Sequence, residues 1–502
     1  SRLTARPSPM DTILTFDLGT TGCKVCLWDA EGVLLSSADH SYPIHHPKPD
    51  WAEQDPEDWW GAAVAAGRQC LAGQEPSRIA AIGLSSQREG VVPIGRDGKP
   101  LSRCIIWMDR RCREQSVRLG EEFGVSFLHH HTGVAPDPNY TACKLLWMRE
   151  NQPELLDRTA TFLQPRDFLY HRLTGAPATD YTLASRTMMI DIRRETWWRE
   201  MFDRVGARFD QFPPIYRSTD APHRSAVEAT AALGIRTGIP VALGGGDRSC
   251  EGVGAGLSGD RASDSTGTAT QVSMVADRLP ENLGRVPCGI HAIPGRYLFE
   301  LGASTTASAM RWLRELFGLS PTEVEGLERE AAQSPPGARN LLMLPFLMGA
   351  RSTRWNPDAR GLILGLSLGH TRGDIARALM EGAGYEVATC LDGLREIGIT
   401  PGELVVIGGG ARSDLWAQIK ADILGCPVYR PRYTEAASLG AAILAATAVG
   451  LITDPEATAR KWNPPVETFT PNPEATHIYQ DRRRLFDDVY TALVPLFPRL
   501  LA

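Results

Sequence analysis

Residues 12–28 read Thr-Ile-Leu-Thr-Phe-Asp-Leu-Gly-Thr-Thr-Gly-Cys-Lys-Val-Cys-Leu-Trp. Apolar and β-branched residues on both sides of a polar glycine turn are typical of a β-hairpin. Residues 29–32 form a second turn and residues 33–38 a third strand. A helix is expected over residues 56–71, where Asp55 suits the N-cap and Pro56 the first helical position, and residues 79–85 form the next strand. This β-β-β-α-β order differs from the alternating order of a Rossmann domain and predicts an α/β domain that opens with an antiparallel meander.

A similar order recurs in the second half of the chain. Residues 262–266, 270–275 and 297–301 are expected strands, followed by a helix over about 305–317. A long amphipathic helix over residues 375–397 precedes a strand at 403–407. Two meanders that each open with a glycine–threonine turn predict a duplicated domain. We expect one domain over residues 10–257 and the second over residues 258–495, with the boundary in a glycine-rich stretch.

Length and composition exclude several classes of protein. A chain of 502 residues is too long for one core, and its 43% hydrophobic and 22% charged residues are those of a globular protein. A net charge of −6 argues against a nucleic-acid binder, and no apolar run approaches the ~20 residues of a membrane span. Residues 1–10 lack the apolar segment of a signal peptide.

Ten scattered cysteines predict reduced thiols in a cytoplasmic protein. Cys23 and Cys26 would face opposite sides of a strand, so we expect no redox or metal role for this pair.

The first glycine turn carries groups that suit phosphate binding. Backbone N–H groups and the hydroxyls of Thr20 and Thr21 can hold phosphate oxygens, and Asp17 at the strand end can hold Mg²⁺ through water. Lys24 adds a positive charge for a transferring phosphoryl group. An ordinary hairpin turn is the alternative. Because a second such turn, with Gly267 and Thr268, lies in the other half, the pair predicts a phosphate chain held between two domains. No P-loop sequence is present.

Asp247 follows three glycines next to the domain boundary. A carboxylate there can accept a hydroxyl proton as a general base, and the glycines would let a substrate come close. The alternative is an N-cap for the following helix, a role that can coincide with catalysis.

Polar side chains follow two further strands and would suit a ligand with many hydroxyls. They are Gln87, Arg88 and Glu89 after one strand, and Trp107 and Asp109 after another. The alternative is a surface ion pair of Arg88 with Glu89 or Asp109.

A glycine-rich turn over residues 408–413 lies between a strand and a helix, where a nucleobase or a phosphate can approach the backbone. Close packing of that strand and helix is the alternative for this turn.

Together these pieces resemble the carbohydrate kinases of the FGGY family, within the actin-like ATPase superfamily, from about residue 12 to residue 497. The matching stretches are Asp17-Leu-Gly-Thr-Thr-Gly, Trp51-Ala-Glu-Gln-Asp-Pro, Lys144-Leu-Leu-Trp, Gly244-Gly-Gly-Asp, Gly361-x-x-x-Gly-Leu, Gly408-Gly-Gly-Ala-Arg-Ser and Ser438-Leu-Gly-Ala-Ala. The resemblance implies two ribonuclease-H-like domains, each a mixed sheet with flanking helices, that close on a cleft. It also implies ATP and Mg²⁺, a sugar or polyol substrate, and a homodimer that binds neither nucleic acid nor membrane.

The resemblance also assigns roles to residues. It makes Asp247 the catalytic base and Asp17 the residue next to Mg²⁺. The ATP site would comprise Asp17, Thr20, Thr21, Lys24, Gly267, Thr268, Gly409, Gly410, Ala411 and Ser413. The substrate site would comprise Gln87, Arg88, Glu89, Trp107, Asp109, Asp247 and Arg248.

The residues of the expected sugar site combine features of several kinds of kinase. Residues 51–60 and 107–109 look like those of xylulokinases, which typically carry Met-His where this chain has Arg88 and Glu89. Glycerol kinases carry Gln-Arg-Glu there, and autoinducer-2 kinases carry Arg-Glu-Gly. We expect a ketopentose such as D-xylulose, with glycerol, another polyol or autoinducer-2 as alternatives. A non-catalytic actin-like sensor of sugar or nucleotide is the alternative from another class.

Overall fold

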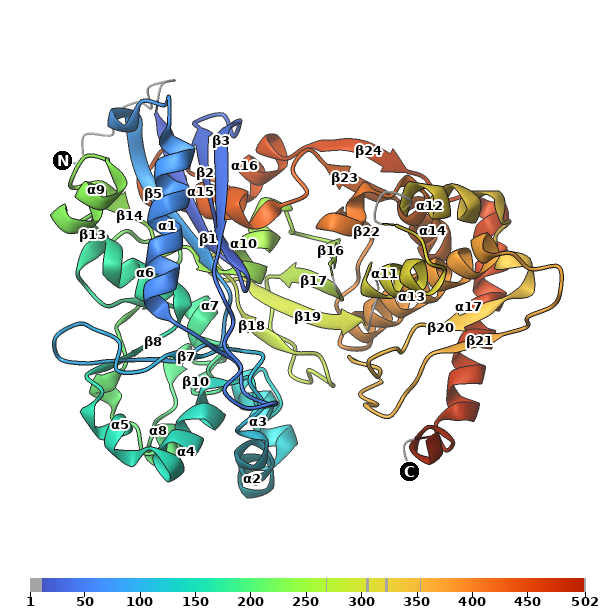
Figure 1. Cartoon of the computed structure of the whole chain (residues 1–502), viewed down its shortest axis with the longest axis horizontal. Coiled ribbons are helices and arrows are strands. Elements are labelled where there is room, and N and C mark those ends of the chain that lie inside the picture. Colours follow the sequence, from blue (N-terminus) through green and yellow to red (C-terminus); the bar gives the residue numbers. More distant parts are fainter. Residues whose placement is uncertain (1–10, 268, 304–306, 321–323, 353, 501–502) are drawn as a thin grey trace.

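The computed structural model describes residues 11–267, 269–303, 307–320, 324–352 and 354–500. In this part of the chain two seven-stranded sheets form the centres of two α/β lobes, which lie side by side (Figure 1). We call them the first lobe and the second lobe. The expected helix start at about residue 305 lies outside the described residues.

The first sheet has the expected meander. Strands β1 (Thr12–Leu18), β2 (Gly22–Asp29) and β3 (Leu34–Ser41) pair antiparallel, and β5 (Ile79–Ser86) lies parallel to β1 on its other side. Beyond β5 come β14 (Pro240–Val241) and β13 (His223–Arg224), and the short β15 (Gly245–Gly246) pairs with the end of β5. Helix α1 (Pro56–Leu71) starts with Asp55 as its N-cap, as predicted.

The second sheet repeats this arrangement. Its order is β18-β19-β17-β16-β22-β23-β24. Strand β16 (Arg261–Thr266) is antiparallel to β17 (Thr270–Ala276) and parallel to β22 (Glu403–Ile407), just as β1 is antiparallel to β2 and parallel to β5. The remaining strands are β18 (Cys288–Ile290), β19 (Tyr297–Ala303), β23 (Val428–Pro431) and β24 (Pro465–Phe469). The predicted repeat of the meander is therefore confirmed.

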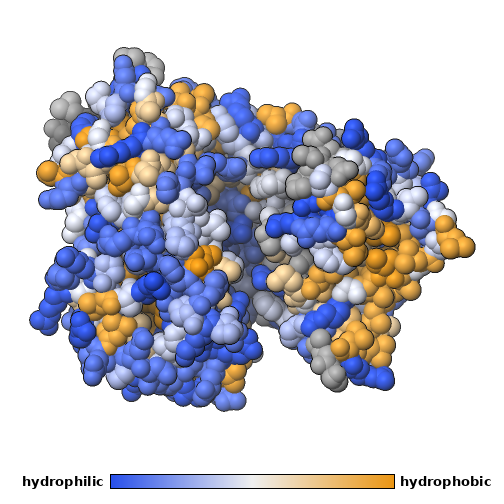
Figure 2. Space-filling view, in the orientation of Figure 1, coloured by the Kyte–Doolittle hydropathy of each residue, from blue (hydrophilic) through white to orange (hydrophobic). Residues whose placement is uncertain are grey.

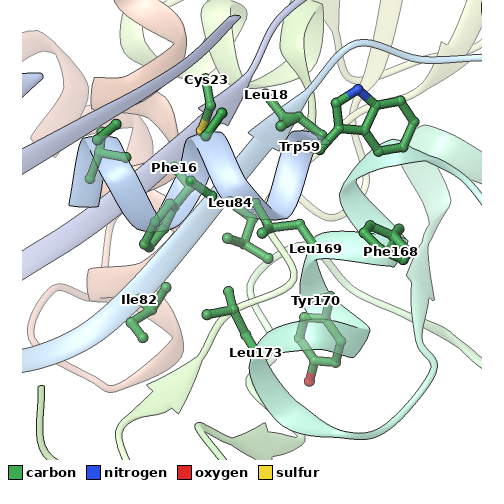
Figure 3. Packing of buried hydrophobic residues seen from close by; sticks show 14 of the residues in the cluster. Phe16, Leu18, Cys23, Trp59, Ile82, Leu84, Phe168, Leu169, Tyr170 and Leu173 are labelled. Carbon is green, nitrogen blue, oxygen red and sulfur yellow. The ribbon is translucent and has the colours of Figure 1, made fainter. Parts of the chain in front are cut away.

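Alternation along β1 divides its side chains between two cores. Phe16 and Leu18 pack with Ile82 and Leu84 of β5 against α1 and α6 (Pro165–Thr174), as Figure 3 shows. On the opposite face, Ile13 packs against α15 (Ala436–Ala448). Side chains also alternate along the neighbouring strand β2. Cys23 packs in the core with Phe16 and Leu18, whereas Cys26 packs in the core with Ile13 on the opposite face.

Two helices cross where the lobes meet. Helix α10 (Asp247–Gly254) follows the first sheet, whereas α15 comes from the second half of the chain and covers the face of the first sheet opposite to α1. Gly254 lies against the carbonyl of Ala436, and Gly440 lies against the carbonyl of Cys250. Only glycine fits at either position. A Cβ on Gly254 would lie 2.0 Å from the carbonyl oxygen of Ala436, and a Cβ on Gly440 would lie 1.8 Å from that of Cys250.

Three helices of the second half correspond to expected helices. They are α11 (Ala307–Leu316), α13 (Arg372–Glu396) and α14 (Asp414–Leu424). Most of the other remaining helices and strands form insertions and covering layers that no sequence pattern predicted in detail. In the first lobe they are β4 (Glu53–Gln54), β6 (Val92–Ile94), β7 (Cys104–Ile105), α2 (Arg113–Phe123), α3 (Val125–Thr132), α4 (Thr141–Asn151), α5 (Pro153–Arg158), β8 (Thr161–Leu163), β9 (Thr179–Asp180), α7 (Tyr181–Ala184), β10 (Ile190–Asp191), β11 (Thr196–Trp197), α8 (Arg199–Val205), β12 (Ile215–Tyr216) and α9 (Val227–Leu233). In the second half they are α12 (Val324–Gln333), β20 (Leu342–Leu344), β21 (Leu362–Leu364), α16 (Pro455–Trp462) and α17 (Pro473–Leu493).

Candidate active site

The polar residues singled out in the sequence gather where strands of both sheets end. Asp17 near the end of β1 is paired with Ser85 of β5, and Gly246 of β15 is paired with Ser86. Asp247 therefore begins its helix beside the end of β5. The carboxyl ends of these parallel strands meet at one edge of the sheet, and this edge faces the second lobe. Figure 2 shows a hydrophilic hollow between the two lobes.

Asp247 is the first residue of α10, with Gly246 rather than Asp247 as the N-cap. Its side chain keeps 38% exposure, and its Oδ1 lies 3.2 Å from Nε of Arg88. Dense protein surroundings raise the pKa of Asp247, whereas the charges of Arg88 and Arg248 act to lower it. A carboxylate that is open to the cleft and has a raised pKa is suited to accept a proton.

The three glycines before Asp247 make room for protein rather than for a ligand. Gly244 has φ of +60°, and a Cβ there would meet the carbonyl oxygen of Leu84 at 1.8 Å. A Cβ on Gly246 would meet the side chain of Arg88 at 2.4 Å. Gly246 thus allows Arg88 to reach the catalytic candidate, and Gly244 and Gly245 lie against Leu84 and Thr182. These contacts with protein atoms differ from the expectation that the glycines admit the substrate.

Arg88 joins the two lobes through a buried ion pair. Both of its Nη atoms donate to Glu300 of β19, each at 2.8 Å. Arg186 completes a group of four charges, since its Nε donates to Glu89 at 2.7 Å and its Nη1 lies 3.6 Å from Glu300. Burial would raise the pKa of Glu300, but Arg88 and Arg186 outweigh it and hold this pKa at about 2. Arg88 also lies 4.0 Å from Glu89, and the two side chains are only 11% and 8% exposed, so this pair is not the surface ion pair considered as the alternative.

Asp17 has the features of a residue beside a cation. Its Oδ1 is buried and has no hydrogen-bond partner in the described part of the chain. Burial and the nearby carboxylates of Asp247 and Glu251 raise its pKa to about 6. These observations fit the Mg²⁺ that the resemblance implies. Among the described residues no group of three or more His, Cys, Asp or Glu side chains could hold a metal, so water and phosphate oxygens would supply most of its ligands, as Mg²⁺ prefers.

The first glycine turn is held from several sides. Trp107 donates from Nε1 to Oγ1 of Thr20 at 3.0 Å, and Gln54 donates to the Thr20 carbonyl at 2.6 Å. Gln87 donates to Gln54 at 2.7 Å and to the Gly19 carbonyl at 3.2 Å. Thr21 is exposed at the tip. The turn therefore connects the predicted sugar residues Gln87 and Trp107 directly to the predicted phosphate residues.

Lys24 lies opposite Asp17 on β2, but its ammonium group pairs with Glu435, just before α15. Both side chains are partly exposed, at 35% and 57%. The ammonium group of Lys24 is therefore bound to Glu435 from the second half of the chain. It would have to leave this partner to reach a phosphate at the first turn.

The second turn lies against the glycine-rich turn. Oγ1 of Thr266 donates to Asp264 at 2.6 Å, and the buried Lys420 of α14 lies 2.5 Å from Asp264. Gly267 is exposed, and Thr268 lies outside the described residues. Gly410 is close to Thr266, since a Cβ on this glycine would lie 2.4 Å from Cγ2 of the threonine. The glycine-rich turn therefore packs directly against the end of β16, from which the second turn starts.

The glycine-rich turn combines an open part with a structural part. A 3-10 turn, η5 (Gly409–Arg412), joins β22 to α14. Nothing lies within 4 Å of a Cβ built on Gly409, which leaves space above its backbone. Ala411 is buried. Ser413 accepts from the Trp416 N–H as the N-cap of α14 and contacts Glu328. The predicted packing of strand against helix and the predicted space for a ligand therefore coexist.

Asp109 is set apart from the residues around Asp247. It is completely buried. It accepts from the Ala52 N–H at 2.6 Å and, through both carboxylate oxygens, from Arg111 at 2.7–2.9 Å. Its oxygens are thus engaged within the first lobe, where they order the segment that carries Trp107.

Several residues of this site escaped the sequence reasoning. Arg186 and Glu300 come from distant segments, and neither belongs to a recognisable motif. Ser265 immediately precedes the second turn, and Glu251 lies four residues after Asp247 on the same helix. The helical spacing of Glu251 is the one local signal that could have been used, because residues four apart share a face.

Two family models match the chain, described as the FGGY family of carbohydrate kinases, N-terminal domain, over residues 12–254, and C-terminal domain, over residues 265–449. Xylulose kinase of Escherichia coli (strain K12) is 33% identical over 488 residues, which cover 96% of this chain and 99% of the relative. Glycerol kinase of Thermococcus gammatolerans is 32% identical over 451 residues, which cover 87% and 89%.

Solved structures are similar over the whole length. Gluconate kinase from Lactobacillus acidophilus has a TM-score of 0.91 at 25% identity, covering 98% of this chain and 99% of its own. Ligand-bound xylulose kinase from the same organism has a TM-score of 0.90 at 25% identity, covering 98% and 100%. The predicted two-domain α/β fold is confirmed by these matches, which cover both lobes.

Proposed function

Because the chain belongs to the FGGY family of carbohydrate kinases, we propose that it transfers the γ-phosphoryl group of ATP to a primary hydroxyl of a small ketose, with D-xylulose as the first candidate. Membership of this family makes the protein a carbohydrate kinase and makes a sugar and ATP its substrates. The observation that carries the proposal is the position of Asp247. Its side chain is 38% exposed and contacts Arg88. Asp247 follows the end of β15 beside β5, and the next residue, Arg248, reaches the strand of the second turn.

In the proposed mechanism Asp247 accepts the proton of the sugar hydroxyl as its oxygen attacks the γ-phosphorus. The new bond joins that oxygen to phosphorus, and the bond from phosphorus to the β–γ bridging oxygen breaks. ADP leaves with the electron pair of that bond. The lobes position the reactants and exclude water, which limits hydrolysis of ATP.

The phosphate chain would lie between the two glycine turns. We propose that Thr20, Thr21 and Gly267 contact its oxygens, together with Thr268, and that Lys24 contributes once it leaves Glu435. The adenosine would lie over Gly409 and Gly410, with Ala411 and Ser413 shaping that turn. Bound Mg²⁺ would neutralise phosphate charge. Asp17, whose buried Oδ1 lacks a partner, would hold its water shell.

The sugar would contact Gln87, Arg88, Glu89 and Trp107, and Asp109 would support this site through Arg111. Oε1 of Gln87 is buried without a hydrogen-bond partner among the described residues, so a substrate hydroxyl could donate to it. The xylulose kinases among the relatives and solved structures favour a ketopentose. The Arg88–Glu89 pair and the glycerol kinase relatives favour glycerol or another polyol as the second candidate.

We also propose a cytoplasmic homodimer. The sequence composition and the reduced thiols support this location, and the homodimer rests on the family resemblance. In the part of the chain that the structure describes, no helix is long and apolar enough to cross a membrane.

The test is a panel of acceptors assayed for ADP formation with Mg-ATP. The panel contains D-xylulose, D-ribulose, glycerol, gluconate and a sample without acceptor. We expect the highest kcat/KM with D-xylulose and little ADP without acceptor. A preference for glycerol would replace the ketose by a polyol. Binding of sugar and nucleotide without any sugar-dependent ADP formation would show a sensor instead of an enzyme.

A further inference from the structure

Arg248 connects the helix that carries Asp247 to the strand that leads into the second glycine turn. It is the second residue of α10, and its Nη1 donates to Oγ of Ser265 at 3.0 Å. Ser265 lies near the end of β16, two residues before Gly267. The guanidinium group therefore lies between the proposed base and the proposed phosphate site, and it contacts both lobes.

Glu251 and Ser265 fix the position of this guanidinium group. Glu251 accepts from Nη1 of Arg248 at 2.7 Å through Oε2, and from the Ser265 hydroxyl at 2.6 Å through Oε1. The three side chains thus close a ring of hydrogen bonds. Glu251 is 16% exposed and Arg248 is 31% exposed, so the carboxylate is the more buried partner and the guanidinium group keeps an accessible surface.

The location of Arg248 differs from that of a typical sugar ligand. The group of buried charges that includes Arg88, Glu89 and Glu300 occupies one side of Asp247, whereas Arg248 extends towards Ser265 on the strand of the second turn. In an in-line transfer the phosphoryl group passes between the attacking hydroxyl at the base and the nucleotide phosphates. A guanidinium group beside this path matches the planar geometry of phosphoryl oxygens.

We propose that Arg248 is a catalytic residue that binds the non-bridging oxygens of the phosphoryl group during transfer, and that Glu251 and Ser265 position it. This inference rests on the proposed in-line transfer with Asp247 as base. It replaces the role of sugar ligand that the family resemblance gives to Arg248.

The role of Arg248 adds no reactant to the chemistry. The hydroxyl oxygen forms its bond to phosphorus, its proton passes to Asp247, and the bridging oxygen departs on ADP with the bonding electrons. Arg248 keeps its own protons and donates hydrogen bonds to the oxygens whose charge is redistributed. Such a contact is strongest in the transition state, so it should affect kcat more than KM.

The test compares Arg248→Lys, Arg248→Gln and Arg248→Ala with wild type. Steady-state kinetics with the preferred sugar give kcat and the sugar KM. We expect kcat to fall by about 10²–10³-fold, as for loss of one preorganised donor, with a nearly unchanged sugar KM. Added guanidinium ion should restore part of the activity of Arg248→Ala, which loss of a purely structural contact would not allow.

A binding measurement separates the phosphoryl role from all others. Calorimetry is done with MgADP alone and with MgADP plus aluminium fluoride, which mimics a planar phosphoryl group. The variants should bind MgADP like wild type but lose the extra affinity gained with fluoride. The titration is run with and without sugar, so the result for Arg248 stands even if the acceptor panel refutes D-xylulose.

Arg296→Gln is the matched control. Arg296 pairs with Glu456 at 2.9 Å and is 33% exposed, which is close to the state of Arg248, but it lies outside the proposed site. The Arg296→Gln variant should have the kcat of wild type and the same gain in affinity with MgADP plus aluminium fluoride. For Arg248, a raised sugar KM with normal kcat and normal fluoride affinity would overturn the proposal and restore the role of sugar ligand. Thermal unfolding of each variant shows whether it is folded.

Discussion

At the residue scale, the proposed mechanism depends most on Asp247. Asp247→Asn keeps the size of the side chain and removes its ability to accept a proton. We expect kcat to fall by roughly 10²–10⁴-fold, the usual contribution of a positioned general base. Nucleotide binding, measured by calorimetry with MgADP, should remain. Turnover close to wild type would remove Asp247 from the mechanism.

Arg88, the neighbour of Asp247, is expected to influence the pH at which the proposed base works. The positive charge of Arg88, 3.2 Å away, lowers the pKa of Asp247 against the upward effect of burial. Arg88→Gln removes this charge, so the pKa of Asp247 rises further and the base becomes protonated at a higher pH. The acidic limb of the profile of kcat/KM against pH should therefore move to higher pH than in wild type.

Asp17 contributes to the same limb, because its pKa is about 6 and it interacts with Asp247. The limb then reports the pair and not one residue. Arg118→Gln is the control, since Arg118 forms an ion pair with Glu150 at the surface. Its profile should match wild type. An unshifted limb in Arg88→Gln would show that Arg88 does not control the base.

Site residues that belong to one short stretch of sequence could be predicted, whereas residues brought together from distant segments could not. Asp17 and Thr20 belong to one short turn, and Asp247 follows a glycine run, so local patterns reveal them. Glu300 contacts Arg88 from more than 200 positions away, and no local pattern records such a contact. Asp109 was found by its place after a strand, but only the structure shows that Arg111 and Ala52 occupy its oxygens.

At the element scale, strands with clear alternation could be predicted and crossings between lobes could not. The β1–β2 hairpin follows from residues 12–28 alone, because its apolar and turn residues are neighbours in sequence. Helix α15 is apolar on most of its surface, and its pattern does not tell which sheet it covers. Its position against β1 and β5 depends on glycines and alanines that admit a close approach.

The crossing of α10 and α15 gives a prediction about stability. Gly440→Ala places a methyl group 1.8 Å from the carbonyl oxygen of Cys250. Backbone must shift to accept it, and such overpacking costs typically 1–3 kcal/mol. Urea unfolding should show this loss. Since α10 begins with Asp247, kcat should fall as well.

Gly61→Ala provides the control. Gly61 lies inside α1, and nothing lies within 4 Å of a Cβ built on it. Alanine should therefore stabilise this helix by roughly 0.5–1 kcal/mol without affecting catalysis. Equal stability of Gly440→Ala and wild type would contradict the tight crossing.

At the scale of the whole molecule, two lobes share one polar hollow and are joined at several places. The Cys288 N–H donates to the Gly133 carbonyl at 2.8 Å, and the Ile290 N–H donates to Oγ of Ser185 at 2.9 Å. Arg88 of the first lobe pairs with Glu300 of the second, and Lys24 pairs with Glu435.

The chain passes between the sheets at residues 256–260, where Gly256 and Gly259 both have positive φ. It passes again between β23 and α15, and once more between α16 and β24. The first passage follows α10 and the second leads into α15, the two crossing helices, so these two are the expected hinges for a relative rotation of the lobes.

Ligand binding should close the lobes about these hinges. In the proposed function, sugar contacts the first lobe and nucleotide contacts both lobes. A closed arrangement would therefore gain contacts with both ligands that an open one lacks. Small-angle scattering should show a smaller radius of gyration with sugar and MgADP than without ligands. Asp247→Asn should close as wild type does, because it lacks only the proton acceptor and keeps the binding surfaces. A radius that stays constant in every ligand state, in a protein whose ligand binding is confirmed by calorimetry, would refute closure. Catalysis would then have to exclude water by a means other than rotation of the lobes.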